Sequence, residues 1–144
     1  TIKSRCLEYK IDLKLNDTKL IVDNYFDEKI YDNINDNLKN YYSTPKFLIS
    51  LINYLKENDL SISNTSISIL IRNIIDNKHY DKQAFVKEYL NYIIELFFYN
   101  NISITKKISY KLKNYYYYKL SNIRKFNLDH ETFFLEFKDK LLNE

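Results

Sequence analysis

The sequence predicts an all-α protein, a compact bundle of six or seven helices in one domain. Three observations indicate this class: the 144 residues contain no glycine and one proline, apolar residues recur at helical spacing, and short links of Asn, Ser and Asp separate the apolar stretches. Tight hairpins and bulges favour glycine, whereas Asn tolerates the left-handed conformation that ends many helices. We therefore expect helices that end on Asn.

The first forty residues carry two patterns. Apolar residues alternate with charged ones on either side of Asn16-Asp17, which favours a short β-hairpin; a short helix is an equal alternative, because the turn lacks glycine. Apolar residues then recur every fourth position, which predicts one long amphipathic helix. Its apolar positions are Val22, Phe26, Ile30, Ile34, Leu38 and Tyr42.

Two helices are expected in the middle of the chain. Thr44 suits the N-cap and Pro45 the first helical position, where the missing N–H costs nothing. This helix is expected to end at Asn58, in the left-handed conformation. The next follows the helical spacing of apolar residues over 67–77.

Three further helices are expected to start at caps. Asp81 is the expected cap of a helix that is apolar on most of its circumference and ends near Asn100; such a helix is usually central and buried. Thr105 is the expected cap of the next helix and Asp129 of the last. The inward residues of the last helix are expected to be Phe133, Phe134, Phe137 and Leu141.

No long linker divides the chain, so we expect residues 1–144 to form a single domain. The first residue is Thr1 and there is no methionine, which predicts an excised segment or a processed product of a longer chain. Abundant Lys, Asn, Ile and Tyr indicate an A+T-rich genome, as in a parasite, a bacterium or a large DNA virus. Cys6, the only cysteine, mildly favours a reducing intracellular compartment. No apolar run reaches the roughly 18 residues of a membrane span.

The missing glycine excludes glycine-rich phosphate loops and the nucleophile elbow of α/β-hydrolases. His79 and His130 are far apart in sequence and show no metal-ligand spacing; we interpret both as solvated surface residues. Asp129 and Glu131 beside His130 suit a helix start better than a catalytic cluster. We therefore expect no catalytic residue, no metal and no cofactor, and an enzyme that uses either histidine is a third, weaker hypothesis.

Charge is concentrated in one segment. Residues 1–99 carry a net charge of −1, residues 100–126 carry +7 without any acidic residue, and residues 127–144 carry −3. The segment also contains four consecutive tyrosines, of which Tyr116 is expected to face the core. The candidate binding residues are Lys106, Lys107, Tyr110, Lys111, Lys113, Tyr115, Tyr117, Tyr118, Lys119, Arg124 and Lys125.

Two functions are expected for the chain. The first is a non-enzymatic protein-interaction or scaffolding module whose partner is another protein, because aromatic residues make up 17% of the chain and are enriched at interfaces. The alternative is binding of RNA or single-stranded nucleic acid through the helix at about 105–125, with Lys attracting phosphate and Tyr stacking on bases. Only three of the 22 basic residues are Arg, which disfavours base-specific readout. A purely solvated lysine face would show the same pattern.

Overall fold

Helices surround one apolar core in the computed structural model, which describes residues 13–40, 43–104, 108–126 and 128–142. No strand occurs within these ranges. Seven α-helices are present in them, so the all-α class is confirmed: α1 Leu15–Phe26, α2 Pro45–Glu57, α3 Ile67–Asp76, α4 His79–Lys82, α5 Ala84–Tyr99, α6 Tyr110–Phe126 and α7 Glu131–Phe137. The 3-10 turns η2 (Tyr31–Asn33) and η3 (Asp36–Leu38) and the π-helical turns η4 (Asn100–Ile104) and η5 (Lys138–Leu142) complete the helical elements.

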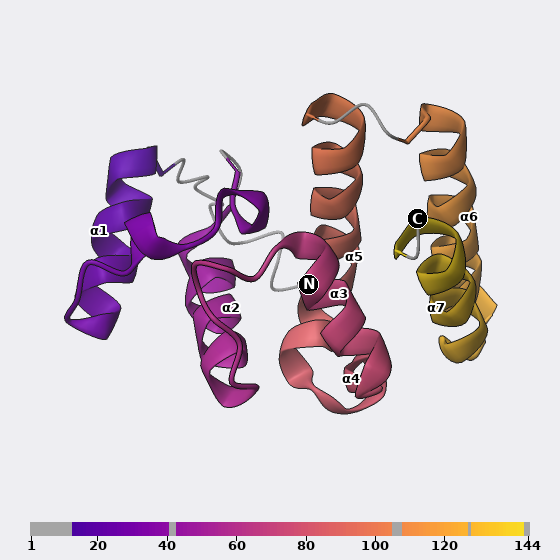
Figure 1. Cartoon of the computed structure of the whole chain (residues 1–144), viewed down its shortest axis with the longest axis horizontal. Helices are drawn as coiled ribbons and strands as arrows, with labels where there is room; N and C mark the ends of the chain where they lie inside the picture. The colour runs from indigo at the N-terminus through magenta and orange to yellow at the C-terminus, as the bar shows by residue number, and fades with distance from the viewer. Residues whose placement is uncertain (1–12, 41–42, 105–107, 127, 143–144) are drawn as a thin grey trace, which may run out of the picture.

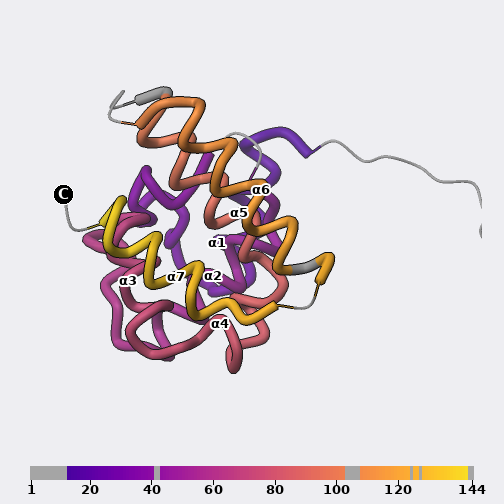
Figure 2. Tube along the Cα trace, turned by 90° about the vertical axis from the view of Figure 1, so that its right-hand side faces the viewer, coloured from indigo at the N-terminus to yellow at the C-terminus, as the bar shows by residue number. Residues whose placement is uncertain are grey.

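The helices follow one another along the long axis of the molecule. Figure 1 shows α1 and α2 at one end, α3, α4 and α5 in the middle, and α6 with α7 at the other end. Figure 2 views the molecule from the α6–α7 end. Helix α5 packs against α2, α3, α4 and η3, and the side chains of Val86, Ile93 and Ile94 are fully buried. The central buried helix expected from the sequence is therefore confirmed.

Helices α2, α3 and α5 end on Asn, but α2 does not end in the expected conformation. Asn58 follows α2 and donates its side-chain amide to the Tyr54 carbonyl at 2.8 Å; Asn77 bonds the Asn73 carbonyl at 3.1 Å after α3. Neither residue is left-handed. The expected left-handed Asn58 is therefore wrong: its side chain satisfies a carbonyl at the helix end, and the next residue makes the turn.

Among the described residues, three take the left-handed conformation at helix ends, each with φ of 53°: Asp27, Asp59 and Lys78. At the end of α2, Leu60 N bonds the Leu55 carbonyl at 2.9 Å and Asp59 N bonds the Lys56 carbonyl at 3.3 Å. This pair of bonds is the Schellman motif, which glycine usually completes. In this chain, Asp or Lys takes the left-handed position at which other proteins usually have glycine.

The single long helix expected from Val22 to Tyr42 is wrong. Helix α1 stops at Phe26, and Asp23 Oδ1 accepts a hydrogen bond from Tyr31 N at 2.8 Å, which turns the chain into η2. Asn35 N then bonds the Ile62 carbonyl at 3.1 Å. The four-residue spacing nevertheless identified core positions correctly, because 3-10 turns also return side chains to one side every three to four residues. The buried ones are Val22, Ile30, Ile34 and Leu38.

The N-terminal hairpin is also wrong where the structure describes it. Asn16 and Asp17 lie in the first turn of α1, and the Asp17 carboxylate accepts a hydrogen bond from Lys14 N at 3.2 Å. The short-helix alternative therefore holds from Leu15 onwards. Cys6 and the first half of the hairpin pattern lie outside the described residues.

Of the four expected caps, one is confirmed. Phe47 N donates to Thr44 Oγ1 at 3.2 Å at the start of α2. Asp81 instead lies inside α4, because the chain after α3 forms one further helical turn before α5 begins. Asp129 makes no cap at α7, and Thr105 lies outside the described residues. The inward faces are nevertheless as expected, with Phe133, Phe134 and Phe137 buried and Leu141 half-buried.

Candidate functional site

Helix α6 carries nine of the eleven candidate binding residues, while Lys106 and Lys107 lie outside the described residues. The helix is anchored by Tyr116, which is fully buried as expected and meets the rings of Phe133 and Phe137 at 5.8 and 5.2 Å. Arg124 belongs to the same helix. Because Tyr116 fixes the rotation of α6, it decides which candidate residues face solvent.

One row of candidate residues faces solvent. Lys111, Tyr118 and Lys125 are seven residues apart and therefore share one side of the helix. All three are exposed, Tyr118 at 68%, and within the described ranges neither lysine forms an ion pair. We call Lys111, Tyr118 and Lys125 the α6 stripe. Tyr110 is also exposed, at the N-terminal end of the helix.

Tyr117 lies about 100° around the helix from Tyr118 and closes the edge of the core. Its ring lies 6.0 Å from that of Phe98, and the ammonium of Lys113 lies 5.4 Å above it. Its hydroxyl is buried and has no hydrogen-bond partner among the described residues. Burial raises the pKa of this hydroxyl. Tyr117 therefore offers no free ring face, and the structure separates it and Lys113 from the α6 stripe.

Lys119 and Tyr115 are held by an acid on α7. Glu136 accepts hydrogen bonds from Lys119, from Lys140 at 2.8 Å and from the Tyr115 hydroxyl at 3.0 Å. These bonds, that of Lys119 above all, hold the pKa of Glu136 at about 2. The ammonium of Lys119 also lies 4.8 Å above the Tyr115 ring. One predicted binding charge is therefore neutralised within the protein.

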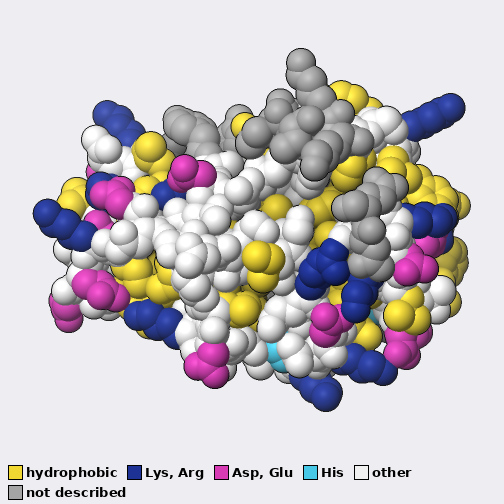
Figure 3. Space-filling model, viewed as in Figure 1, with side chains coloured by type: hydrophobic (Ala, Val, Ile, Leu, Met, Phe, Trp, Pro, Cys, Tyr) yellow, Lys and Arg dark blue, Asp and Glu magenta, His cyan; other side chains and the backbone are white. Residues whose placement is uncertain are grey.

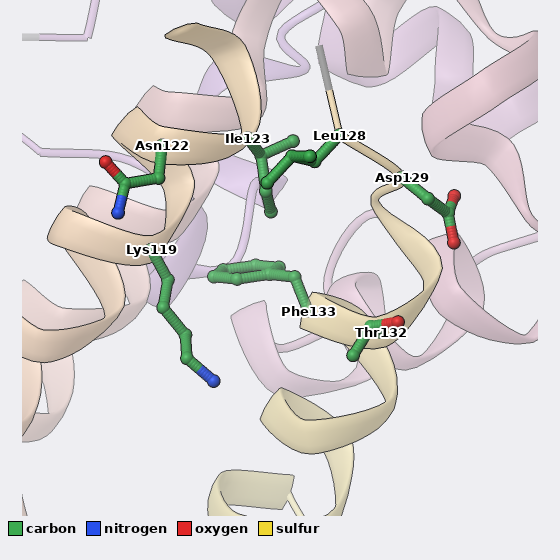
Figure 4. A pocket seen from close by; sticks show the side chains of 7 residues that line it. All are labelled: Lys119, Asn122, Ile123, Leu128, Asp129, Thr132 and Phe133. Atoms are coloured by element: carbon green, nitrogen blue, oxygen red, sulfur yellow. The ribbon is translucent and has the colours of Figure 1, made fainter. Parts of the chain in front are cut away.

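A hollow of about 370 Å³ lies between α6 and α7. Figure 4 shows the Phe133 ring between the two helices, with Ile123 and Leu128 above it and Lys119, Asn122 and Thr132 at the sides. Phe133 and Ile123 are almost fully buried, while Leu128 is 53% exposed. The lining residues are Lys119, Asn122, Ile123, Leu128, Asp129, Thr132 and Phe133.

Apolar side chains continue beyond the hollow. Phe126 is 60% exposed, and Leu135, one turn of α7 beyond Thr132, is 59% exposed. Figure 3 shows hydrophobic side chains gathered at the end of the molecule formed by α6 and α7. We call the α6 stripe, the hollow and Phe126 together the α6–α7 surface. The hollow could not be predicted from the sequence, because Leu128, Asp129, Thr132 and Phe133 reach it only through the packing of α7 against α6.

The histidines are packed and not simply solvated. His79 Nδ1 lies 2.6 Å from the Tyr54 hydroxyl, which also donates to Asn73 Oδ1 at 2.8 Å. Burial lowers the pKa of His79. His130 is half-buried, with its ring 6.4 Å from that of Phe134. The surface interpretation of His79 is therefore wrong, and its contacts are those of a structural residue.

No group of three or more His, Cys, Asp or Glu side chains in the described part of the chain could hold a metal ion. Among the same residues, no helix combines the length and the apolar character needed to cross a membrane. No protein family, no curated protein and no solved structure compared with this chain matches it. Function is therefore inferred from the α6–α7 surface alone.

Proposed function

We propose that the chain is a non-enzymatic protein-interaction or scaffolding module and that its partner protein docks on the α6–α7 surface. The observation that carries this proposal is the hollow, which has an apolar floor of Ile123 and Phe133 and exposed Leu128 and Phe126 beside it. Its volume accommodates one or two large apolar side chains. Anchors of this kind, buried in a central pocket, supply most of the binding energy of many interfaces.

Burial of the exposed side chains supports the same conclusion. Complete burial of a Leu or Phe side chain contributes roughly 1.5–3 kcal/mol, so covering Leu128 and Phe126 would contribute appreciably to association. The basic α6 stripe beside them favours an acidic partner surface and raises the rate of encounter with it. Catalysis is not part of the proposal, since His79 is held by Tyr54 and His130 packs on Phe134.

The test compares two exposed apolar positions on different parts of the molecule. Leu128 lies at the hollow and Ile69, 45% exposed, lies on α3. We expect Leu128→Asp to weaken the complex with a purified native partner at least tenfold and Ile69→Asp to leave its affinity unchanged. Equal effects of the two substitutions, or no effect of Leu128→Asp, contradict the proposal.

A second candidate function rests on the α6 stripe alone. Lys111 and Lys125 lie on either side of the exposed Tyr118 ring and form no ion pair with any described residue, although the ammonium of Lys125 lies 5.3 Å above the Phe126 ring. This arrangement suits the backbone and bases of RNA or single-stranded DNA. Fluorescence anisotropy of a labelled oligonucleotide at low salt tests it. Lys111→Glu with Lys125→Glu should abolish binding, and restoring each contact should steepen the salt dependence by about 0.7 in log–log slope. An unchanged anisotropy with the wild-type chain excludes this candidate.

A further inference from the structure

A cleft of about 400 Å³ lies at the end of the molecule formed by α1 and α2, away from the α6–α7 surface (Figure 1). Two segments line it: the turn from α1 into η2, and the end of α2 with the loop that follows it. We call the space bounded by Glu28, Ile30, Lys56, Leu60 and Ile62 the α1–α2 cleft. Its volume lies within the range of small-molecule sites, roughly 300–1,000 Å³.

The apolar side of the α1–α2 cleft is fixed by hydrogen bonds between its two segments. Ile30 is almost fully buried, and Leu60 and Ile62 are half-buried against the same core. Asn35 N bonds the Ile62 carbonyl at 3.1 Å, and the side-chain amide of Asn35 donates to the Ser63 carbonyl at 3.0 Å. The cleft is therefore preformed, as small-molecule sites usually are.

Glu28 and Lys56 place opposite charges at the α1–α2 cleft. Glu28 Oε1 and Lys56 Nζ are 3.5 Å apart, the longest ion pair in the described part of the chain, and both side chains are about half exposed. The ammonium of Lys56 also lies 4.6 Å above the Phe26 ring, which limits its movement. An exposed pair of this kind contributes little to stability, so each charge is available to a ligand of opposite charge.

This ion pair selects ligands by charge. An anion bound to Lys56 would lie beside the carboxylate of Glu28, and a cation bound to Glu28 would lie beside the ammonium of Lys56; like charges repel each other at such distances. A ligand with one charge of each sign avoids both repulsions. In an α-amino acid the two charges are attached to one carbon atom, so they reach two partners only where these lie as close together as Glu28 and Lys56.

We propose that the α1–α2 cleft binds a free α-amino acid with an apolar side chain. The ligand carboxylate pairs with Lys56 and the ligand ammonium pairs with Glu28, while the ligand side chain covers Ile30, Leu60 and Ile62 and removes their surface from water. This site goes beyond the proposed function, because no residue of the α6–α7 surface takes part in it. Each of the two proposals can therefore fail without the other.

Leucine is the probe, and three related compounds each lack one recognised group. Isocaproate lacks the ammonium, isoamylamine lacks the carboxylate and glycine lacks the apolar side chain. Amide NMR spectra of the isotopically labelled chain follow binding at residues 28–33 and 56–63. We expect saturable shifts of these amides with leucine and at least about tenfold weaker binding of each of the three other compounds.

Two variants test the charges in the protein. Glu28→Gln and Lys56→Gln each remove one charge from an exposed side chain, and we expect each to weaken leucine binding at least about tenfold. Lys46→Gln and Glu88→Gln are the matched controls, because Lys46 and Glu88 form another exposed ion pair, at 2.6 Å, and do not line the cleft. Far-UV circular dichroism checks that every variant keeps its helices.

The controls should bind leucine as tightly as the wild type does. The proposed site is overturned by any of three results: no saturable shift with leucine, equal binding of leucine and one of the three related compounds, or an unchanged affinity in Glu28→Gln or Lys56→Gln. An equal loss of affinity in the control variants would also overturn it. The comparison of the four compounds uses only the wild-type chain, so it decides the question even where a variant does not fold.

Discussion

Tyr54 places its hydroxyl in the core, where it joins side chains from two other helices. The hydroxyl donates to Asn73 Oδ1 and lies 2.6 Å from His79 Nδ1, and Tyr54 is only 2% exposed. Tyr54→Phe leaves both partners without this bond, and we predict a loss of about 1–3 kcal/mol in the free energy of unfolding. Urea denaturation measures it. Tyr118→Phe, on the exposed stripe, is the control and should change stability by less than about 0.5 kcal/mol.

Tyr117 differs from Tyr54 in the environment of its hydroxyl. Its hydroxyl is buried without a partner in the described structure, so its desolvation is not repaid by a hydrogen bond. We predict that Tyr117→Phe leaves stability unchanged or raises it by about 1 kcal/mol in the same denaturation experiment. A loss comparable to that of Tyr54→Phe would show that the hydroxyl is bonded in solution.

Glu136 gives the α6–α7 contact a pH dependence. Its pKa is about 2 in the folded protein, below its ordinary value of 4.5, mainly because Lys119 bonds the ionised form. A lowered carboxyl pKa stabilises the folded state above the unfolded pKa, and this stabilisation is lost as the pH falls from about 4.5 towards 2. Asp32 and Glu88 act in the same direction. We therefore predict that Glu136→Gln flattens, but does not abolish, the acid slope in thermal unfolding from pH 6 to pH 2.

At the scale of single elements, the helix ends show what the absence of glycine means structurally. Asp59 has φ of 53° in the Schellman motif after α2. Glycine adopts this conformation without the steric cost of a Cβ atom. We predict that Asp59→Gly raises the free energy of unfolding by about 0.5–1 kcal/mol, although glycine also makes the unfolded chain more flexible.

A second glycine substitution is the matched control for that prediction. Glu57 is the exposed last residue of α2 and is two positions away from Asp59. Glu57→Gly should lower the free energy of unfolding by up to about 1 kcal/mol, because its backbone is helical. Changes of opposite sign in the free energy of unfolding for Asp59→Gly and Glu57→Gly would support the left-handed conformation of Asp59. Destabilisation by both would contradict it.

Elements with local signals could be predicted from the sequence. Helix α2 has its cap and proline, and α3 and α5 have apolar residues at helical spacing, so their positions were confirmed within a few residues. The break after Phe26 could not be predicted. It depends on a hydrogen bond from Tyr31 N to Asp23 and on contact between Asn35 and Ile62, which are 27 residues apart. For residues 22–38, the buried positions could be predicted but the continuity of the helix could not. An α-helix and a series of 3-10 turns both return side chains to the core at similar spacing.

At the scale of the whole molecule, the basic helix of the candidate site could be predicted from the sequence, whereas the surroundings of its side chains could not. The charge excess and the tyrosines predicted a basic helix in this region, and α6 is that helix, with five basic residues and no acidic one. Its division into an outer row and an inner row depends on the packing of Tyr116 against α7. The neutralisation of Lys119 depends on Glu136, 17 residues later in the chain. The contacts between α6 and α7 therefore limit the exposed basic surface of α6 to a narrow stripe beside an apolar hollow.

The most direct test of the α6–α7 surface is site-specific photo-crosslinking in the source cells. A photoreactive phenylalanine analogue replaces Leu128 at the hollow or, as the control, Ile69 on α3; both native side chains are exposed. Addition of Thr132→Trp fills the hollow from an exposed position of its lining. We predict a defined adduct with another protein from position 128 only, and its loss with Thr132→Trp. No adduct at position 128, equal adducts at both positions, or an adduct that persists with Thr132→Trp would contradict docking at this surface.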